Sequence, residues 1–496
     1  MTLVWLIALP FIAGILCWLA RDWSVQAPRW IALTTMTALF LISLVLWWTG
    51  DIGEGRWLME WRSAWIPRFG IEVHLALDGL SVVLVTLTAL LGMLAVLCSW
   101  TDVTERVGFF HFNLMWVLGG VVGVFLALDL FLFFLFWELM LVPMYFLVAL
   151  WGHAGAEGKT PIRAATRFFI YTQASGLLML VAILTLVFVH QAGSGEYSFN
   201  YEVLLNADVP EALRMPLMLG FFIAFAVKLP VPPLHGWLPD AHAQAPTAGS
   251  VLLAGILLKT AAYGLLRFAL PLFPEASLTF APVAMALGLA GIIYGAILAC
   301  GQHDMKRLIA YTSISHMGFV LIALYAGTAL ALQGAIVVMV AHAFSSAALF
   351  MLSGQVRERV HSLDMRDMGG LWSRLPVLPV FFLAFVAASL GMPGTANFVG
   401  EFMVLFGSFP VSPVVVVIAC TGLVLAAIYS LLLMQRVNYG PVQSENPLAG
   451  PDRREYASLL ALLALVILFG LYPQPLLDTT APLVDRLELL FTAEAE

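Results

Sequence analysis

The sequence predicts an all-α polytopic membrane protein with about fourteen transmembrane helices. Of its 496 residues, 61% are hydrophobic and 11% are charged, and the mean hydropathy is +0.96. Soluble domains, by contrast, are about 25% charged. Apolar stretches of roughly 17–25 residues, the length that crosses a bilayer, recur along the whole chain. These features leave no soluble domain of useful size.

Short loops join the expected spans, and basic residues divide unevenly between the two sides. With the N-terminus placed outside, fifteen basic residues fall on the cytoplasmic side and six on the other, as the positive-inside rule requires. Both termini are therefore expected on the outer, periplasmic side. The expected spans cover residues 3–20, 30–49, 79–99, 108–127, 130–150, 165–190, 217–238, 247–268, 280–300, 307–326, 330–352, 376–396, 413–435 and 455–473.

Two expected spans are interrupted by Pro and Gly near their middles. The interruptions are FAVKLPVPPLHGWLP (225–239) and AASLGMPGTANFVGEF (387–402), five spans apart. Unwound backbone at membrane depth is tolerated only inside protein or beside a water-filled cavity, and paired broken helices indicate a site between two structural repeats. Because five is odd, the second five-helix repeat is expected to be inverted. The predicted units are residues 1–106 (helices 1–3), 107–270 (first repeat), 278–436 (second repeat) and 437–496 (a loop, helix 14 and a short tail).

A small set of strongly polar residues lies within the apolar spans. A charge at a helix centre costs roughly 2.5–3.5 kcal/mol on insertion scales, so each of these residues is a candidate site residue. Only four lysines occur in the chain, and two of them belong to this set. Its members are Asp129, Glu138, Lys228, Lys259, His316, His342 and Glu401.

Glu138 is flanked by apolar residues for about two turns on each side, so it needs a cationic partner inside the membrane. Lys228, at the first interruption, is the nearest candidate, and its break would free backbone carbonyls for a cation or a chain of water. At ~4 Å and an effective dielectric of about 20, such a pair is worth ~4 kcal/mol. Moving Glu138 toward or away from Lys228 can therefore make the lysine bind or release a proton. Asp129 lies on the opposite helix face and is expected near a turn, with a lesser role.

Hydroxyl residues accompany the remaining candidates. Lys259 has Thr260 beside it and Tyr263 one turn on, so we expect hydroxyl neighbours within one helix. Each histidine has two hydroxyl residues three or four positions away, on its own helix face, where ordered water could bridge polar groups. Histidine, with an ordinary pKa of ~6.5, suits a proton relay. The hydroxyl residues are Thr312 and Ser313 for His316, and Ser345 and Ser346 for His342.

Structural explanations compete with these functional ones. The buried charges could form ion pairs that only hold helices together, and each histidine could be a packing hydrogen-bond donor. The segment PPLHGWLPDAHAQAPTAG could be a surface turn carrying His235 and His242, whose spacing fits no common zinc pattern. We expect no metal site. The carboxylates of loops 51–78 and 196–211 are expected on a solvated face.

The cysteines and the net charge exclude other classes of function. The four cysteines occur singly within apolar spans, so neither an iron–sulfur site nor a disulfide framework is predicted. A net charge of −7 indicates no nucleic-acid partner.

Four stretches resemble the antiporter-like membrane subunits of respiratory complex I and their relatives in multi-subunit Na⁺/H⁺ antiporters. The resemblance covers about residues 75–440. Other branches of the family place a lysine or other base at the position of Glu401, so the glutamate makes this chain similar to the M-type branch, which is homologous to mitochondrial subunit four. A short amphipathic piece in residues 482–496, rather than a long C-terminal helix, argues against the L-type. The stretches are FWELMLVPMYFLVALWG (136–152), KLPVPPLHGWLPDAHAQAPTAGSVLLAGILLKTAAYGLLR (228–267), HDMKRLIAYTSISHMGF (303–319) and MPGTANFVGEFMVL (392–405).

The resemblance implies a proton-translocating subunit of NADH:quinone oxidoreductase, with no redox chemistry in this chain. NADH, FMN, iron–sulfur clusters and quinone are then expected in partner subunits, and L- and N-type antiporter-like subunits are expected neighbours in the bacterial inner membrane. The alternatives are a Na⁺/H⁺ antiporter subunit and a purely structural subunit. The implied proton-relay roles are Glu138 paired with Lys228, Lys259 as the central relay, His316 and His342 in a hydrated axis, and Glu401 as the terminal site.

Overall fold

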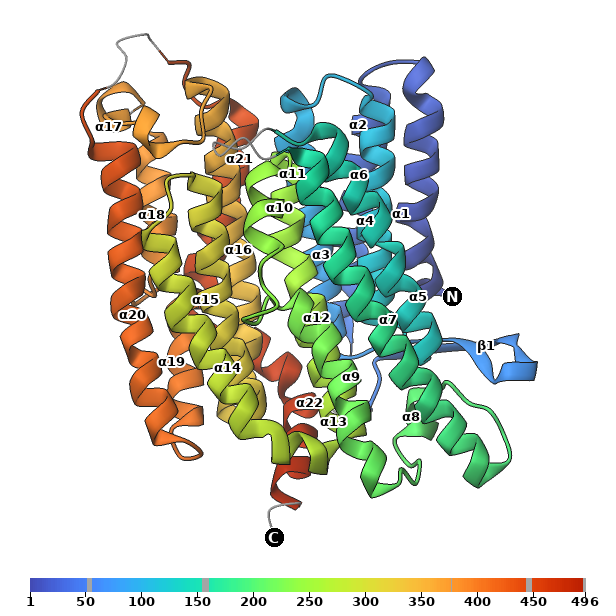
Figure 1. The fold of residues 1–496 in the computed structure, drawn as a ribbon. Helices are drawn as coiled ribbons and strands as arrows, with labels where there is room; N and C mark the ends of the chain where they lie inside the picture. The colour runs from blue at the N-terminus through green and yellow to red at the C-terminus, as the bar shows by residue number, and fades with distance from the viewer. Residues whose placement is uncertain (51–55, 154–159, 376, 443–447, 494–496) are drawn as a thin grey trace.

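The chain folds into a bundle of helices that run roughly parallel to one axis, with one small hairpin at its side (Figure 1). The computed structural model describes residues 1–50, 56–153, 160–375, 377–442 and 448–493. Within these ranges, twelve helical segments are long and apolar enough to cross a membrane. This confirms the predicted all-α membrane class. The count of fourteen spans and the inverted repeats stay predictions.

The first half of the bundle contains shorter pieces as well as full spans. A proline occupies the first or second position of several helices, where its missing N–H group costs no helical hydrogen bond. The elements are α1 (Thr2–Leu19), α2 (Ala27–Thr49), β1 (Met59–Ile66), β2 (Ile71–Leu77), α3 (Gly79–Asp102), α4 (Val107–Leu126), α5 (Leu130–Leu139), α6 (Leu141–Trp151), α7 (Pro161–Ser194), α8 (Tyr201–Leu204), α9 (Glu211–Lys228), α10 (Leu238–Gln244), α11 (Thr247–Leu252), α12 (Leu258–Gly264) and α13 (Leu270–Leu272).

Two π-helical turns, Leu253–Leu257 and Leu265–Ala269, join α11, α12 and α13 into one continuous span.

The second half of the bundle contains longer helices and the second break. The remaining elements are α14 (Pro274–Cys300), α15 (Met305–Ala326), α16 (Ala329–Val360), α17 (Leu371–Arg374), α18 (Leu378–Ser389), α19 (Ala396–Ser408), α20 (Pro413–Met434), α21 (Arg453–Leu471) and α22 (Gln474–Ala493).

Three spans form the interior of the bundle. The apolar windows of Thr247–Leu272 and Ala329–Val360 are wholly buried, and that of α15 nearly so, whereas most residues of α2 and α21 face outwards. A helix that is apolar on all sides and carries a few polar groups belongs in such a core. Lys259, His316 and His342 lie on these three central spans, so the fold places them far from lipid.

The loop 51–78 is more ordered than a solvated face. Residues 59–77 form an antiparallel hairpin with Met59 opposite Leu77, and Gly70 at φ 64° makes its turn. Asp129 caps α5 by accepting from the backbone N–H groups of Phe131 and Leu132, and it also accepts from Glu72 of the hairpin. This agrees with its expected place at a turn. Asp51 and Glu54 lie outside the described residues.

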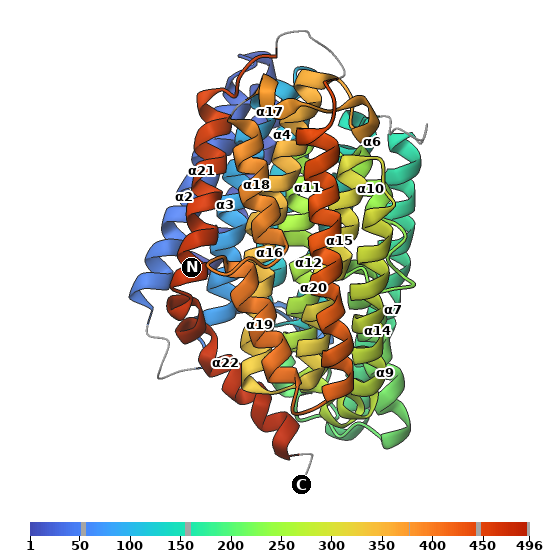
Figure 2. The same ribbon diagram turned by 90° about the vertical axis from the view of Figure 1, so that its left-hand side faces the viewer.

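The C-terminal prediction was partly wrong. In place of a short amphipathic piece, α22 is a 20-residue helix that begins three residues after α21 ends. It packs against α3 and α16, and Figure 2 shows it continuing from α21 toward the C-terminus along one side of the bundle. Its apolar residues Leu476, Val484 and Leu487 are buried, so the packed face of the helix begins before residue 482.

Candidate functional site

Lys228 is the last residue of α9, at the first helix break. Its side chain is 1% exposed, and the chain turns through residues 229–237 before α10 begins. The indole Nε1 of Trp237 donates to the carbonyl of Val227 at 2.8 Å. One carbonyl near the break is therefore satisfied by a side chain, whereas we had expected such carbonyls to be available to a cation or to water.

The ammonium of Lys228 faces an aromatic ring rather than a carboxylate. Its Nζ lies 3.8 Å from the ring centroid of Trp137, a cation–π contact worth about 2 kcal/mol when desolvated. Neither Lys228 Nζ nor Glu138 Oε1 has a hydrogen-bond partner in the described part of the chain. The charges of Glu138 and Lys228 interact through space, but the described residues show no direct ion pair between them.

Lys259 lies between the two π-helical turns and reaches across to another helix. Its Nζ is 2.7 Å from Nδ1 of His342 on α16 and donates to the carbonyl of Ala254 at 2.5 Å. A π turn leaves a carbonyl without its usual i+4 donor, and such turns are frequent at functional sites. Lys259 is fully buried. The prediction that hydroxyl groups of the same helix accompany Lys259 was wrong. The hydroxyls of Thr260 and Tyr263 donate instead to the carbonyls of Leu257 and Phe125.

His316 on α15 connects both arms of the second broken helix. Its Nδ1 lies 2.8 Å from Oε1 of Glu401 on α19, and its Nε2 lies 3.2 Å from Oγ of Ser389, the last residue of α18. The hydroxyl of Tyr429 on α20 is 3.4 Å from the same Nε2. Gly391 and Gly394, with φ of 79° and 91°, let the chain turn between α18 and α19. A single imidazole thus contacts three other helical segments.

These contacts form a line of four ionisable side chains through the second half of the bundle. The rings of His342 and His316 lie edge to face with centroids 5.5 Å apart, so the line runs from Lys259 through both histidines to Glu401. Each of its members is at most 3% exposed. Toward Lys228 the line is interrupted, since no contact joins Lys228 to Lys259 among the described residues. The structure therefore brings together four of the six predicted site residues.

The hydroxyl residues around the histidines differ from those expected. Thr312 and Ser313 donate to the carbonyl of Ile309 in the preceding turn, a common alternative for hydroxyls within helices. Ser346 donates to the carbonyl of His342 at 2.5 Å and lies 3.5 Å from its Nδ1. The hydroxyls nearest His316 are instead those of Ser389 and Tyr429, which spacing along one helix cannot reveal.

Glycines bring α19 directly against α16. A Cβ at Gly400 would lie 2.7 Å from the backbone nitrogen of Val338, and one at Gly407 would collide with Ala331. Small residues allow this close approach between membrane helices. Since Gly400 precedes Glu401, the contact positions the carboxylate beside the helix that carries His342.

A buried ion pair was missed in the sequence. Arg267 Nη2 contacts Asp78 Oδ2, and both side chains are almost fully buried, although the sequence placed both residues at the solvated ends of spans. Asp78 is also the N-cap of α3, accepting from the Ser81 N–H at 2.9 Å. An aspartate directly before an apolar run is a helix-start signal, so the cap was predictable. Its arginine partner, 189 residues away, was not.

His235 and His242 are not surface residues, which corrects the sequence-based expectation. His242 on α10 is fully buried and stacks on Phe350 with centroids 4.4 Å apart. Neither of its ring nitrogens has a hydrogen-bond partner in the described ranges. Lys306, which the sequence placed in a cytoplasmic loop, is buried too and donates to the carbonyl of Ala245 at 2.8 Å. From Trp237 onwards the proline-rich segment is therefore packed inside the bundle, whereas Pro233 at its start is exposed.

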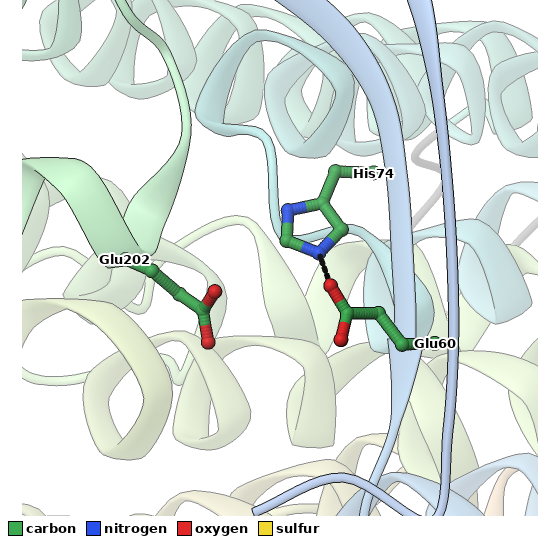
Figure 3. A group of neighbouring side chains, drawn as sticks. All are labelled: Glu60, His74 and Glu202. Atoms are coloured by element: carbon green, nitrogen blue, oxygen red, sulfur yellow. Dashed lines mark hydrogen bonds and ion pairs between the residues drawn. The ribbon is translucent and has the colours of Figure 1, made fainter.

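A second group of polar side chains lies at the hairpin, where Glu60, His74 and Glu202 have potential metal-ligand atoms within 4.8 Å of one another (Figure 3). Asn200 Oδ1 accepts from the Glu202 N–H, so its Nδ2 donates to His74 Nδ1 at 3.0 Å. His74 Nε2 then carries the proton and donates to Glu60 at 2.8 Å. A metal ion here would have to displace this hydrogen bond. The contacts tie the hairpin to α8.

Comparison with known proteins identifies the family. The family described as NADH:quinone oxidoreductase/Mrp antiporter, transmembrane, matches residues 127–427. NADH-quinone oxidoreductase subunit M of Escherichia coli (strain K12) is 60% identical over 99% of this chain and 98% of its own length. The chain belongs to this family. Subunit M of Pseudomonas aeruginosa is also 60% identical, over 97% of this chain and 96% of its own, and that of Rhodobacter capsulatus is 38% identical over 96% and 94%.

Two solved structures share the architecture. A chain of respiratory complex I from Thermus thermophilus with bound NADH aligns with a TM-score of 0.88 and 28% identity, covering 99% of each chain. A chain of the Mrp complex from Dietzia aligns with a TM-score of 0.83, but it is 23% identical and only 52% of it is covered, so it shows the fold alone. The predicted resemblance, including its M-type branch, is confirmed.

Proposed function

We propose that this chain is the proton-translocating subunit M of an NADH-quinone oxidoreductase. The observation that carries the proposal is the line from Lys259 through His342 and His316 to Glu401, buried in a protein whose relatives are named subunit M. The Lys259–His342 and His316–Glu401 contacts lie at the hydrogen-bond distance that a direct proton transfer needs. Between the two histidines, whose rings meet edge to face, a bridging water would carry the proton. A purely structural bundle does not require such a line.

In the proposed mechanism, the free energy of electron transfer in partner subunits acts on this chain by changing the interaction between Glu138 and Lys228. Glu138 Oε1 and Lys228 Nζ have no hydrogen-bond partner in the part of the chain that the structure describes. A small displacement of the carboxylate would therefore change the electrostatic free energy of the ammonium. The proton released from Lys228 would cross the interval to Lys259 by way of water and then follow the line to Glu401. Electron transfer from NADH to quinone, with FMN and iron–sulfur clusters, would take place in partner subunits, among them L- and N-type neighbours.

The proposed setting is the inner membrane, with both termini on the outer side. The α1–α2 connection and α17 lie at one end of the bundle, whereas the C-terminus lies at the other (Figure 1). Arginines occur at the α1–α2 end, including Arg21, Arg366 and Arg374, and the excess of basic residues in loops marks the cytoplasmic side. This arrangement supports the predicted orientation.

The test uses membrane vesicles that contain the assembled complex. Lys228→Ala and Glu138→Ala are each expected to lower NADH-driven quinone reduction and proton translocation together, whereas Glu196→Gln, at an exposed loop carboxylate, should leave both unchanged. Full pumping per assembled complex, with poor assembly, would support a structural role instead. Na⁺-driven proton exchange in the absence of NADH would favour the antiporter alternative.

A further inference from the structure

An apolar groove opens on the surface of the bundle, away from the line of ionisable side chains. It encloses about 540 Å³ and is bordered by α2 and α21, while residues of α3 and α16 such as Leu87 and Phe344 line its floor. Figure 2 shows α2, α3, α21 and α22 on the same side of the molecule. The groove therefore lies on a face that belongs to the membrane-spanning part of the protein.

The side chains around the groove face outwards. Trp48 is 92% exposed and Leu468 is 50% exposed, and both α2 and α21 are apolar enough to cross a membrane. Water is excluded at that depth, and an empty space would forfeit the dispersion contacts of every lining side chain. A hydrocarbon group from outside the chain must therefore fill the groove.

The length of the groove fits one leaflet of a bilayer. Its lining on α2 runs from Phe40 to Trp48, which corresponds to about 12 Å at 1.5 Å per residue. One leaflet contributes about 15 Å of hydrocarbon, half of the ~30 Å core. A groove of this length suits one acyl chain.

One end of the groove carries the features of a membrane–water interface. Trp47 and Tyr472 line this end, as expected for aromatic residues at headgroup level, and Trp47 Nε1 donates to Thr479 Oγ1 at 2.7 Å. Asp478 is the one charged side chain among the described residues that line the groove. The Asp478 carboxylate accepts from Gln474 Nε2 at 2.6 Å and shares the groove lining with Trp48 and Tyr472. A carboxylate attracts an ammonium group by charge, and aromatic rings attract one by cation–π contact.

We propose that this groove binds a phospholipid with a primary ammonium headgroup, of the ethanolamine class. One acyl chain would lie between α2 and α21, and the ammonium would lie at Asp478. The inference depends on the membrane location of these helices and is independent of the proposed function.

The test is photo-crosslinking of the purified, assembled complex with phosphatidylethanolamine that carries a diazirine in its acyl chain. We expect labelled peptides from residues 40–48, 83–90 and 465–472, and competition by unlabelled phosphatidylethanolamine but not by phosphatidylglycerol. Leu468→Trp should fill the groove and reduce labelling about fivefold. The matched control is Val424→Trp on α20, where the native side chain is 64% exposed, and labelling should persist.

Headgroup recognition is tested separately, with a variant that leaves the groove walls unchanged. Asp478→Asn should keep the labelled peptides but remove the preference for phosphatidylethanolamine over phosphatidylglycerol. Equal labelling of α20 and the groove, or equal competition by both lipids in the unchanged protein, would overturn the proposal. Crosslinks from the groove to a neighbouring subunit in place of lipid would show that protein covers it.

Discussion

His316 Nδ1 lies 2.8 Å from Glu401 Oε1, although 85 residues separate them along the chain. This contact joins the central helix α15 to the second broken helix, and both side chains are buried. A buried carboxylate in contact with an imidazole can exchange one proton with it without either group meeting water. The consequences of this contact can be measured.

Glu401→Gln keeps the shape and a hydrogen-bonding oxygen at this position but removes the titrating group. We expect proton translocation to fall by about tenfold or more, corresponding to ~1.4 kcal/mol in the barrier, while the complex still assembles. The measurement is proton translocation per quinone reduced in vesicles, with Glu196→Gln as the exposed control. Unchanged translocation in Glu401→Gln would remove this residue from the relay.

Gly176→Ala tests the position of Glu138 without altering an ionisable group. A methyl group at Gly176 on α7 would collide with Glu138 Oε1, so the carboxylate must move relative to Lys228. Since Coulomb energy depends directly on that separation, we expect turnover and pumping to fall together. Gly193→Ala, on the same helix with nothing within 4 Å of the added carbon, is the matched control. Equal activity of the two variants would contradict the proposed coupling.

His242→Phe separates packing from proton transfer at the residue that the sequence misplaced. A phenyl ring preserves the stacking on Phe350, and it removes two buried nitrogens that lack partners in the described ranges. Leaving such atoms unpaired costs about 1–3 kcal/mol each, so we expect them to meet water on a proton path toward Lys259. Assembly should be retained and pumping reduced. A variant that pumps normally would show that His242 is a packing residue.

The Asp78–Arg267 pair predicts a non-additive effect on stability. Breaking a buried pair on one side typically costs about 3–5 kcal/mol, because the remaining charge is uncompensated. Asp78→Asn and Arg267→Met should each lower the thermal midpoint of the purified complex, and the double variant should recover part of the loss. Additive losses in this double-mutant cycle would show that the two charges do not stabilise each other.

The sequence predicted the membrane class, both helix breaks and the buried set of ionisable residues, because hydrocarbon imposes strict rules on charge and backbone. It did not predict which side chains meet. The contact between Lys259 and His342 crosses between helices and depends on π-helical turns that no simple periodicity reveals. Hydroxyl neighbours inferred from spacing within one helix were wrong at Lys259 and His316, because hydroxyls bond to nearby carbonyls instead.

Proline and charge also misled the assignment of residues to the surface. The segment containing His242 reads as a turn, yet His242 lies on α10, a short helix enclosed by protein directly after the unwound residues 229–237. Unwound backbone and prolines are tolerated at membrane depth in such surroundings. Asp78 and Lys306 stand at the ends of apolar runs, so sequence alone assigned them to loops, whereas the bundle buries both. Such errors arise because burial depends on how the helices assemble, which a single chain pattern does not specify.

The glycine contact between α19 and α16 leaves little tolerance for changes in chain length. Each added residue rotates a helix by about 100°. After one insertion between Gly400 and Gly407, either glycine could still pack against α16, but not both. Deletions face the same conflict, so natural variation in residues 396–408 should proceed by substitution alone.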